Sequence, residues 1–176
     1  MVSPTDSAYK RRLEALNAAT RHCHIDMMEY IEEKDPAIKA EKTFSRLLHC
    51  AVRTSHIDLV RAIMNLGAEI NDDEDELGRT LLMNASSKEM ISFLIDVKAP
   101  LDGRNASGDT ALMHAARICW RQPFKVLLEY RADPNLANND GETALMLAAE
   151  SPYSASTPST LIRELISAKV FFECAG

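Results

Sequence analysis

The stretch Gly108–Ala116 reads GDTALMHAA, and Gly141–Ala149 reads GETALMLAA, so seven of its nine letters return unchanged. The same pattern begins at Gly78 as GRTLLMNAS, a slightly shorter interval before the first copy. Two more distant copies, LLHCAVRTSHIDLVRAIMNLGAEIN (Leu47–Asn71) and LNAATRHCHIDMMEYI (Leu16–Ile31), share the tripeptide HID, which starts at His56 and His24. A period of about 33 residues, repeated about five times, predicts a solenoid of small stacked units.

Each copy carries two apolar stripes with the period of an α-helix. The first half of a unit offers a leucine with small residues one turn later: Leu48 with Ala51, Leu112 with Ala115 and Ala116, Leu145 with Ala148 and Ala149. The second half carries an apolar triad at i, i+3 and i+4: Val60, Ile63 and Met64; Ile91, Leu94 and Ile95; Phe124, Leu127 and Leu128; Ile162, Leu165 and Ile166. One unit cannot bury both stripes by itself. A neighbouring unit can cover them, and this burial stabilises the fold by about 25 cal/mol per Å² of apolar area.

These copies resemble the ankyrin repeat family, whose pattern is G-x-T-P-L-H-x-A-A followed by G-A-D-x-N. The unit starts Gly78-Arg79-Thr80, Gly108-Asp109-Thr110 and Gly141-Glu142-Thr143 match it, as do the unit ends GAEIN (67–71) and RADPN (131–135). The resemblance covers about Leu13 to Phe172. It implies an all-α, ankyrin-repeat solenoid of about five helix-turn-helix units joined by short hairpin-like turns. We expect one domain over residues 1–176, with units at 9–40, 41–74, 75–104, 105–137 and 138–172.

Several positions depart from the family pattern. The proline after the threonine is replaced by Leu47, Leu81, Ala111 and Ala144, which removes a residue suited to a first helical position. The third unit lacks about three residues, which predicts a shortened first helix, and the fifth has a Ser/Pro-rich insertion at Ser151–Ser159. We expect Gly78, Gly108 and Gly141 to adopt positive φ, and the threonines two residues later to cap helices.

Composition excludes several functional classes. With 20 basic and 26 acidic residues the net charge is −6, which disfavours a nucleic-acid partner. The start MVSPTDSAYKRR has no apolar segment after a basic one, and no run of about 18 apolar residues occurs. Four scattered cysteines fit a reducing compartment. We therefore expect an intracellular, cytoplasmic protein, without excluding the nucleus, that is monomeric on its own and does not bind membranes.

No motif indicates catalysis. The HCH sequence at 22–24 has no second cluster to complete four metal ligands, so we expect no metal. Cys50 could be paired with His49 or His114 as a hydrolase, but these are positions at which the family packs its units. P-loop, G-x-G-x-x-G and H-E-x-x-H motifs are absent from the sequence. We predict neither enzyme activity nor a cofactor.

In the family, the turn tips and the exposed end of each first helix line a concave face that grips another protein. By position, the candidate contacts here are Arg21, His22, Arg53, Thr54, Glu76, Arg79, Ser87, Lys88, Asp109, Arg117, Ile118, Glu142 and Glu150. The acidic tips and basic helix ends predict a groove with one acidic and one basic side. Arg53, Lys88 and Arg117 on the basic side are expected to face an acidic or mixed partner surface.

Two alternatives and one modification follow from the resemblance. The chain could be the regulatory ankyrin segment of a larger enzyme or signalling protein, which the apolar end VFFECAG favours, or an ankyrin-type kinase inhibitor. LLEYRADPN (127–135) resembles the L-x5-D-x-N context of asparaginyl hydroxylases, with Asn135 as the acceptor.

Overall fold

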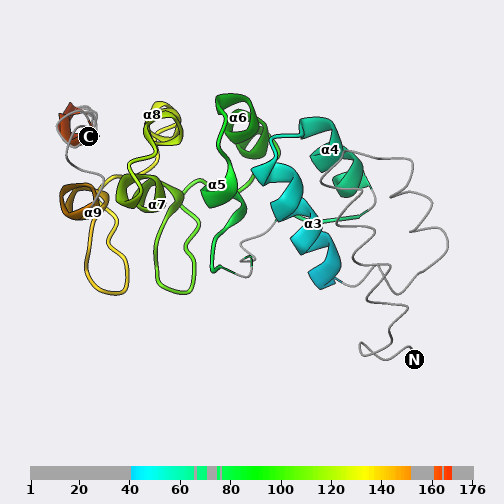
Figure 1. Cartoon of the computed structure of the whole chain (residues 1–176), viewed down its shortest axis with the longest axis horizontal. Coiled ribbons are helices and arrows are strands. Elements are labelled where there is room, and N and C mark those ends of the chain that lie inside the picture. Colours follow the sequence, from blue (N-terminus) through cyan, green and yellow to red (C-terminus); the bar gives the residue numbers. More distant parts are fainter. Residues whose placement is uncertain are drawn as a thin grey trace. The chain divides into compact units, whose positions relative to one another are not determined.

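The computed structural model describes residues 41–65, 67–70, 75, 77–151, 161–163 and 165–167. Its helices follow one another in pairs (Figure 1): α3 (Glu41–Arg53) and α4 (Ile57–Asn65), α5 (Leu81–Asn84) and α6 (Lys88–Asp96), α7 (Ala111–Arg117) and α8 (Arg121–Glu129), then α9 (Ala144–Glu150) and a C-terminal helical segment at 161–163 and 165–167. Strands are absent from the described residues, in which Ala137 and Thr143 form an isolated antiparallel bridge. The predicted all-α fold of paired helices is confirmed. The first predicted unit, 9–40, and residues 152–159 of the Ser/Pro insertion lie outside the described residues.

The chain divides into two compact parts, Met1–Ile70 and Asn71–Gly176. The N-terminal part contains α3 and α4, and the C-terminal part contains α5 to α9 and the C-terminal helical segment. The single domain expected over residues 1–176 stays a prediction.

In the N-terminal part, α3 and α4 pack together through their apolar stripes. The buried apolar side chains of these two helices are Leu47, Leu48, Ala51, Val52, Leu59, Val60 and Ile63. One expectation is wrong here: Leu47, assigned to the helix start, lies inside α3, which begins at Glu41. No Gly-x-Thr stands before Leu47, so the chain lacks the turn that precedes the other first helices, and EKTFSR continues the helix toward the N-terminus.

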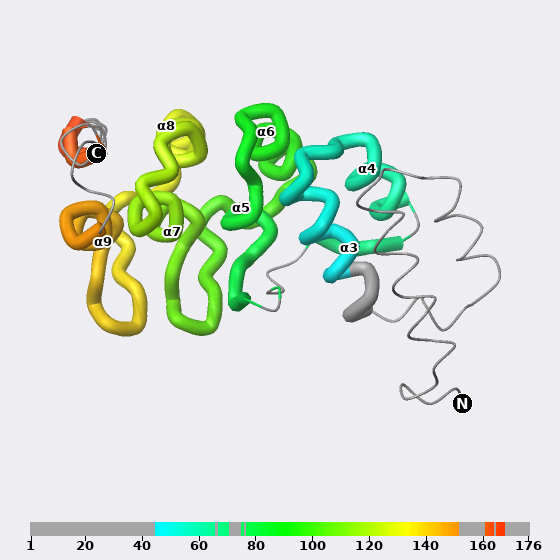
Figure 2. The backbone as a smooth tube through the Cα atoms, viewed as in Figure 1, coloured from blue at the N-terminus to red at the C-terminus, as the bar shows by residue number. Residues whose placement is uncertain are grey.

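In the C-terminal part, α5, α7 and α9 form a row, and long hairpins project from it on the side away from α6 and α8 (Figure 2). The core lies between the helices of this row and their partners. Its largest fully buried side chains are Met90, Ile91, Leu94, Leu112, Met113, Phe124, Leu127 and Leu161. Since full burial of one such side chain stabilises a fold by about 1.5–3 kcal/mol, this core supplies much of the stability of the C-terminal part.

The turns before α5, α7 and α9 have the glycine conformation that the sequence predicts, but the predicted threonine cap forms only at α7 and α9, because the Thr80 side chain makes no capping bond at α5. Gly78, Gly108 and Gly141 have φ of 67°, 77° and 79°, a region open to glycine at little cost. Thr110 and Thr143 then cap α7 and α9, because their hydroxyl oxygens accept hydrogen bonds from backbone N–H groups three residues later at 3.3 and 3.5 Å.

Five of the seven described helices, α3, α4, α6, α7 and α8, end in the same way. The residue after the last turn takes positive φ, its N–H bonds to a carbonyl three residues back, and the next N–H bonds five residues back. This geometry is a Schellman motif, which satisfies the last carbonyls of a helix. The positive-φ residues are Ser55, Gly67, Lys98, Cys119 and Arg131, with φ of 58°, 103°, 70°, 54° and 67°. Four of these five carry a side chain, so most of these helix ends bear backbone strain.

The third unit has the shortened first helix that was predicted. α5 contains 4 residues, whereas α7 and α9 contain 7 each. Ala85 is extended (φ −77°, ψ 118°), and Ser87 already caps α6 by accepting the N–H of Met90 at 3.2 Å. With about three residues missing, the chain must turn into the second helix after a single helical turn.

The outer side of the fifth unit differs from prediction. Leu145 and Ala149 were expected inside with Ala148, but Ala148 is buried while Leu145 and Ala149 are exposed. In the C-terminal helical segment, Leu165 is buried while Ile166 is exposed. Side chains that face a neighbour in the inner units face outward here.

Candidate functional site

Three hairpins of the C-terminal part share one pattern of hydrogen bonds. They span 75–79, 105–109 and 138–142. In each, the first residue's N–H donates to the carbonyl of the fifth at 2.9–3.0 Å, and the glycine's N–H donates back to the carbonyl of the first at 2.7–3.0 Å. These bonds give the described residues of the three hairpins the same geometry.

The first residue of every hairpin also organises it with its side chain. A side-chain oxygen of Asp75, Asn105 and Asn138 accepts the N–H of the fifth hairpin residue at 3.0, 2.8 and 2.9 Å. Asp and Asn favour such turns because their short side chains can bond to nearby backbone groups. No role for Asn105 or Asn138 was predicted from the sequence. An Asp or Asn three residues before each repeated glycine was the signal that could have found them.

Neighbouring hairpins are bonded to one another. The Asn105 amide donates to the carbonyl of Gly78 at 2.8 Å, and the Asn139 amide donates to the carbonyl of Ala106 at 2.9 Å. The backbone N–H of Asn139 reaches the carbonyl of Ser107 at 3.0 Å. These bonds fix the spacing of the hairpins and make a preorganised surface.

Arg79, a predicted contact, is paired within its own hairpin. Its guanidinium donates to Asp75 Oδ2 from Nε at 3.0 Å and from Nη2 at 2.7 Å, and the Asn84 amide donates to the same oxygen at 2.9 Å. Burial alone would raise the pKa of Asp75. The hydrogen bonds from Arg79, Asn84 and the N–H of Leu77 outweigh burial and lower that pKa from 3.8 to about 2.

Arg117 and Asp109 form a second pair. Arg117 Nη2 lies 3.0 and 2.9 Å from the two oxygens of Asp109, and 3.9 Å from Glu142 Oε2. The Asn138 amide donates to both carboxylates at 2.9 Å. Asp109 is 7% exposed, so its assignment to an exposed tip is wrong. A buried carboxylate needs a partner, and the predicted groove cation Arg117 provides it.

His114 lies among these charged groups on α7. Burial of the ring disfavours the charged imidazolium and is the main cause of a lowered pKa of His114. The positive charges of Arg79 and Arg117 lower this pKa further, whereas the negative charges of Asp109 and Asp75 act in the opposite direction. His114 is therefore neutral near neutral pH. The positive charges beside His114 are those of Arg79 and Arg117, which are paired with Asp75 and Asp109.

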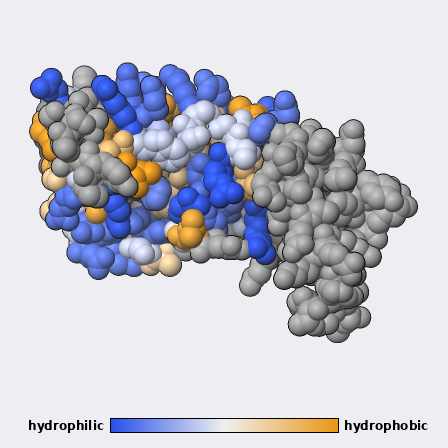
Figure 3. Space-filling model, in the orientation of Figure 1, coloured by the Kyte–Doolittle hydropathy of each residue, from blue (hydrophilic) through white to orange (hydrophobic). Residues whose placement is uncertain are grey.

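The exposed tips of the hairpins differ although their scaffold is constant. Equivalent positions before the glycine carry Leu77, Ser107 and Asp140, all exposed, with Leu77 at 72%. Ala106 and Asn139 are exposed beside them. The surface in Figure 3 is mainly hydrophilic with small apolar patches. We call the exposed residues Leu77, Ala106, Ser107, Asn139 and Asp140 the hairpin face.

Ser87 and Lys88 are not at the end of a first helix, contrary to the sequence analysis. Ser87 is the N-cap of α6, and Lys88 is its first residue. Lys88 Nζ lies 3.1 Å from Glu129 Oε2, at the end of the second helix α8. The shortened α5 moves both residues into the second helix, so Lys88 is not equivalent to Arg53 or Arg117.

The remaining predicted contacts occupy varied places. Arg53 ends α3, and the Thr54 hydroxyl donates to the carbonyls of Cys50 and Ala51 at 3.1 Å, both in the N-terminal part. Exposed Ile118 follows α7, and exposed Glu150 ends α9. Arg21, His22 and Glu76 lie outside the described residues.

Other kinds of site find little support in the part of the chain that the structure describes. There, His, Cys, Asp and Glu side chains do not gather in groups of three able to hold a metal ion. Nor does any helix of these residues have the length and apolar character required to cross a membrane.

Comparison with known proteins identifies the repeats. M-phase phosphoprotein 8 of Rattus norvegicus is 35% identical over 96 residues, which are 52% of this chain and 11% of that protein. Neurogenic locus notch homolog protein 1 of Homo sapiens is 31% identical over 115 residues, 63% of this chain and 4% of that protein. This chain thus spans about a tenth or less of the length of these relatives.

The family described as ankyrin repeats (3 copies) matches residues 48–138 and 82–169, well over half of the chain. The matched range includes the three hairpins and the helix pairs that carry them. On these grounds the chain belongs to the ankyrin repeat family.

Proposed function

We propose that this chain is a non-catalytic protein-interaction module, and that the hairpin face contacts its partner. The observation that supports this most directly is the contrast between a constant scaffold and variable tips. Asp75, Asn105 and Asn138 hold equivalent hairpins, while Leu77, Ser107 and Asp140 at the tips share no chemistry. Side chains that a rigid scaffold presents to solvent are suited to specific recognition.

The ion pairs that Arg79 forms with Asp75 and Arg117 forms with Asp109 limit the chemistry of the partner. Both guanidiniums already neutralise carboxylates of this chain, so a partner that used them would compete with Asp75 and Asp109. The exposed chemistry of the hairpin face is one large apolar side chain, small polar groups and the carboxylate of Asp140. We therefore propose a partner with an apolar side chain opposite Leu77 and a polar or basic group opposite Asp140.

Capture from a cell lysate by the tagged chain of 176 residues, with crosslinking and mass spectrometry, tests this proposal. Leu77→Ser with Asp140→Lys should reduce capture at least tenfold and leave the melting temperature unchanged, since both side chains are exposed. Lys125→Glu on the exposed side of α8 is the matched control, and it should retain capture. If Lys125→Glu abolishes capture and the hairpin variant does not, the partner uses the second-helix side and the site assignment fails.

A second proposal is that the chain acts as the ankyrin segment of a larger regulated protein. The small share of each relative that it covers, 11% and 4%, supports this proposal. Sequencing the transcript that encodes these residues tests it: an open reading frame with further domains is expected, and one restricted to this chain would contradict it.

Asn135 remains a proposed hydroxylation site. The side chain is exposed, and the residue's N–H donates to Asp133 Oδ1 at 2.9 Å, so the turn does not bury the acceptor. Incubation with an asparaginyl hydroxylase and its co-substrates should add one oxygen, located on Asn135 by peptide mass spectrometry. Asn135→Ala should remain unmodified. An unchanged mass of the wild-type chain would remove the proposal.

A further inference from the structure

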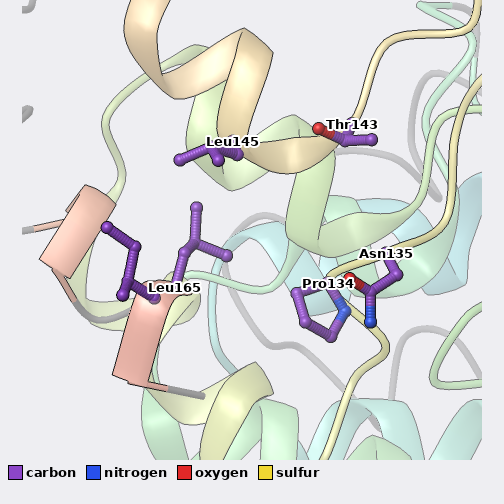
Figure 4. Close-up of a pocket in the computed structure, with 6 residues that line it drawn as sticks. Pro134, Asn135, Thr143, Leu145 and Leu165 are labelled. Atoms are coloured by element: carbon purple, nitrogen blue, oxygen red, sulfur yellow. The ribbon is translucent and has the colours of Figure 1, made fainter. Parts of the chain in front are cut away.

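The first helices of the fourth and fifth units share one backbone geometry. α7 and α9 each contain 7 residues. Their caps, Thr110 and Thr143, have the same φ of −95° and ψ of 168° and 166°. Thr143 lies at the start of α9 in Figure 4. The residue before the cap and the last residue of the helix therefore occupy equivalent backbone positions in the two units.

The charges at these two positions differ between the units. The residue before the cap is acidic in both, Asp109 in the fourth unit and Glu142 in the fifth. The last helical residue is Arg117 in the fourth unit but Glu150 in the fifth. In the fourth unit, Arg117 Nη2 donates to both oxygens of Asp109 at 3.0 and 2.9 Å. The fifth unit has a carboxylate where the fourth has this guanidinium.

Glu142 is positioned by its hairpin without a cation from its own unit. Its Oε2 accepts the Asn138 amide at 2.9 Å. Arg117 of the preceding unit lies 3.9 Å from the same oxygen and closer to Asp109, at 2.9 Å. Glu142 Oε1 accepts no bond from the described residues, and the side chain is 32% exposed. A carboxylate that is held in place by one oxygen can accept a further donor with the other.

Glu150 adds a second carboxylate at the end of α9. The Ser151 hydroxyl donates to the carbonyl of Arg117 at 2.7 Å, so the ends of α9 and α7 lie against each other. Glu150 is exposed and forms neither an ion pair nor a hydrogen bond with the part of the chain that the structure describes. The paired positions of the two units thus carry the carboxylates of Asp109, Glu142 and Glu150 but one guanidinium. This excess of negative charge attracts a cation.

We propose that Glu142 and Glu150 form a binding site for an arginine side chain of the protein partner, whose guanidinium takes the place that Arg117 takes beside Asp109. A planar guanidinium has five N–H donors and can bind two carboxylates at once, whereas the ammonium of lysine acts as a point charge. The site rests on the proposed function as an interaction module, and it lies in the same unit as Asp140 of the hairpin face.

Binding of N-acetyl-arginine methylamide tests the site in the absence of the partner. Titrated into the isotope-labelled chain of 176 residues, this probe should shift the NMR signals of Glu142, Glu150 and Ser151. The citrulline analogue, which has a similar shape but no charge, should cause no shift at these residues. Glu142→Gln and Glu150→Gln should each weaken binding of the arginine probe by about fivefold. Glu89→Gln, which removes an exposed carboxylate from α6, is the matched control and should leave binding unchanged.

An arginine supplied by the chain itself should occupy the site. Glu150→Arg should abolish binding of the probe and raise the melting temperature by about 1–2 °C, because it places a guanidinium beside Glu142 as Arg117 stands beside Asp109. This gain should disappear when Glu142→Gln is added to Glu150→Arg.

Three results would overturn the proposal. The first is an equal response to the arginine and citrulline probes. The second is equal weakening by Glu89→Gln and Glu150→Gln, which would mean that the acidic chain attracts the probe without a specific site. The third is undiminished capture of the partner by a chain that carries both Glu142→Gln and Glu150→Gln. This last result would leave the proposed function intact, because that function is tested by the substitutions at Leu77 and Asp140.

Discussion

At the scale of single residues, glycine performs two different tasks in the hairpins. Gly108 and Gly141 both have positive φ, but a Cβ on Gly108 would lie 2.5 Å from Asn139 Oδ1 and 2.8 Å from its backbone N. A Cβ on Gly141 would meet nothing within 4 Å. Gly108 is thus required both by its own dihedral angle and by the approach of the next hairpin.

Substitution of these glycines should separate the two effects. Gly141→Ala should cost about 1–2 kcal/mol for the left-handed backbone alone. Gly108→Ala adds an overpacking cost of about 1–3 kcal/mol, because backbone atoms of Asn139 must move. Urea unfolding followed by circular dichroism measures both. Equal losses for the two variants would mean that the hairpins do not approach one another as described.

The carboxylate of Asp75 should make stability depend on acidity. Its folded pKa of about 2 lies below the ordinary 3.8, so the folded state favours the ionised form. The resulting stabilisation is complete above about pH 4 and is lost as the pH falls toward about 2. Asp75→Asn should therefore lower the free energy of unfolding near pH 7, and the difference from wild type should shrink between about pH 4 and 2. A difference that does not vary with pH would contradict the ionic role of Asp75.

Among the helices, several C-terminal ends share one backbone geometry with positive φ, although the residue at that position is a glycine in only one of them. Gly67 meets its positive φ without strain, while Lys98 and Arg131 hold φ of 70° and 67° at equivalent Schellman positions. Their N–H groups bond to Ile95 and Leu128 at 3.0 Å, so the hydrogen bonding of the motif is retained. The fold keeps these turns even where the residue type disfavours them.

Replacement of the strained residues by glycine should stabilise the protein. Lys98→Gly and Arg131→Gly each relieve about 1–2 kcal/mol of strain and lose about 0.5–1 kcal/mol through added chain entropy in the unfolded state. A net gain of about 0.5–1 kcal/mol per site is expected in chemical denaturation. Lys125→Gly, inside α8, serves as the control and should destabilise by about 1 kcal/mol. If glycine destabilises the protein at Lys98 and Arg131 as it does at Lys125, the positive φ of Lys98 and Arg131 carries little strain energy.

At the scale of the whole molecule, stability depends on contacts between successive units. Leu112 lies on α7, which packs against both α8 and α9 and also contacts α5. Leu145 has the equivalent place on α9 but is 41% exposed. The two leucines occupy equivalent positions but contribute differently to the stability of the fold, because different neighbours surround them.

Truncation of the two leucines should reveal this difference. Leu112→Ala should open a cavity and cost about 2–5 kcal/mol. Leu145→Ala should cost less than about 1 kcal/mol, because much of the side chain is already solvated. Thermal and urea unfolding of the two variants measure both losses. If Leu145→Ala proves as costly as Leu112→Ala, the outer face of the fifth unit is buried in solution.

The sequence alone determined the features that depend on local conformation and on the repeat. The regular repeat period predicted paired helices, the glycines predicted positive φ, and the shorter third unit predicted a short α5. Backbone dihedrals and helix length respond mainly to nearby residues, so one sequence is sufficient to anticipate them. The same information identified the ankyrin repeat family, to which the matched residues belong.

Which side chains are available to a partner depends on the packing of the units and could not be predicted from the sequence. Lys88 was placed by counting from the repeat, but the short α5 put it at the start of α6. Arg117 was expected to be available, yet it pairs with Asp109, which Asn138 of the next unit also binds. Leu112 and Leu145 have the same local sequence, but Leu112 is 1% exposed and Leu145 41%. Burial and pairing depend on what a neighbouring unit places against a residue, and that information is not contained in the residue's own stretch of sequence.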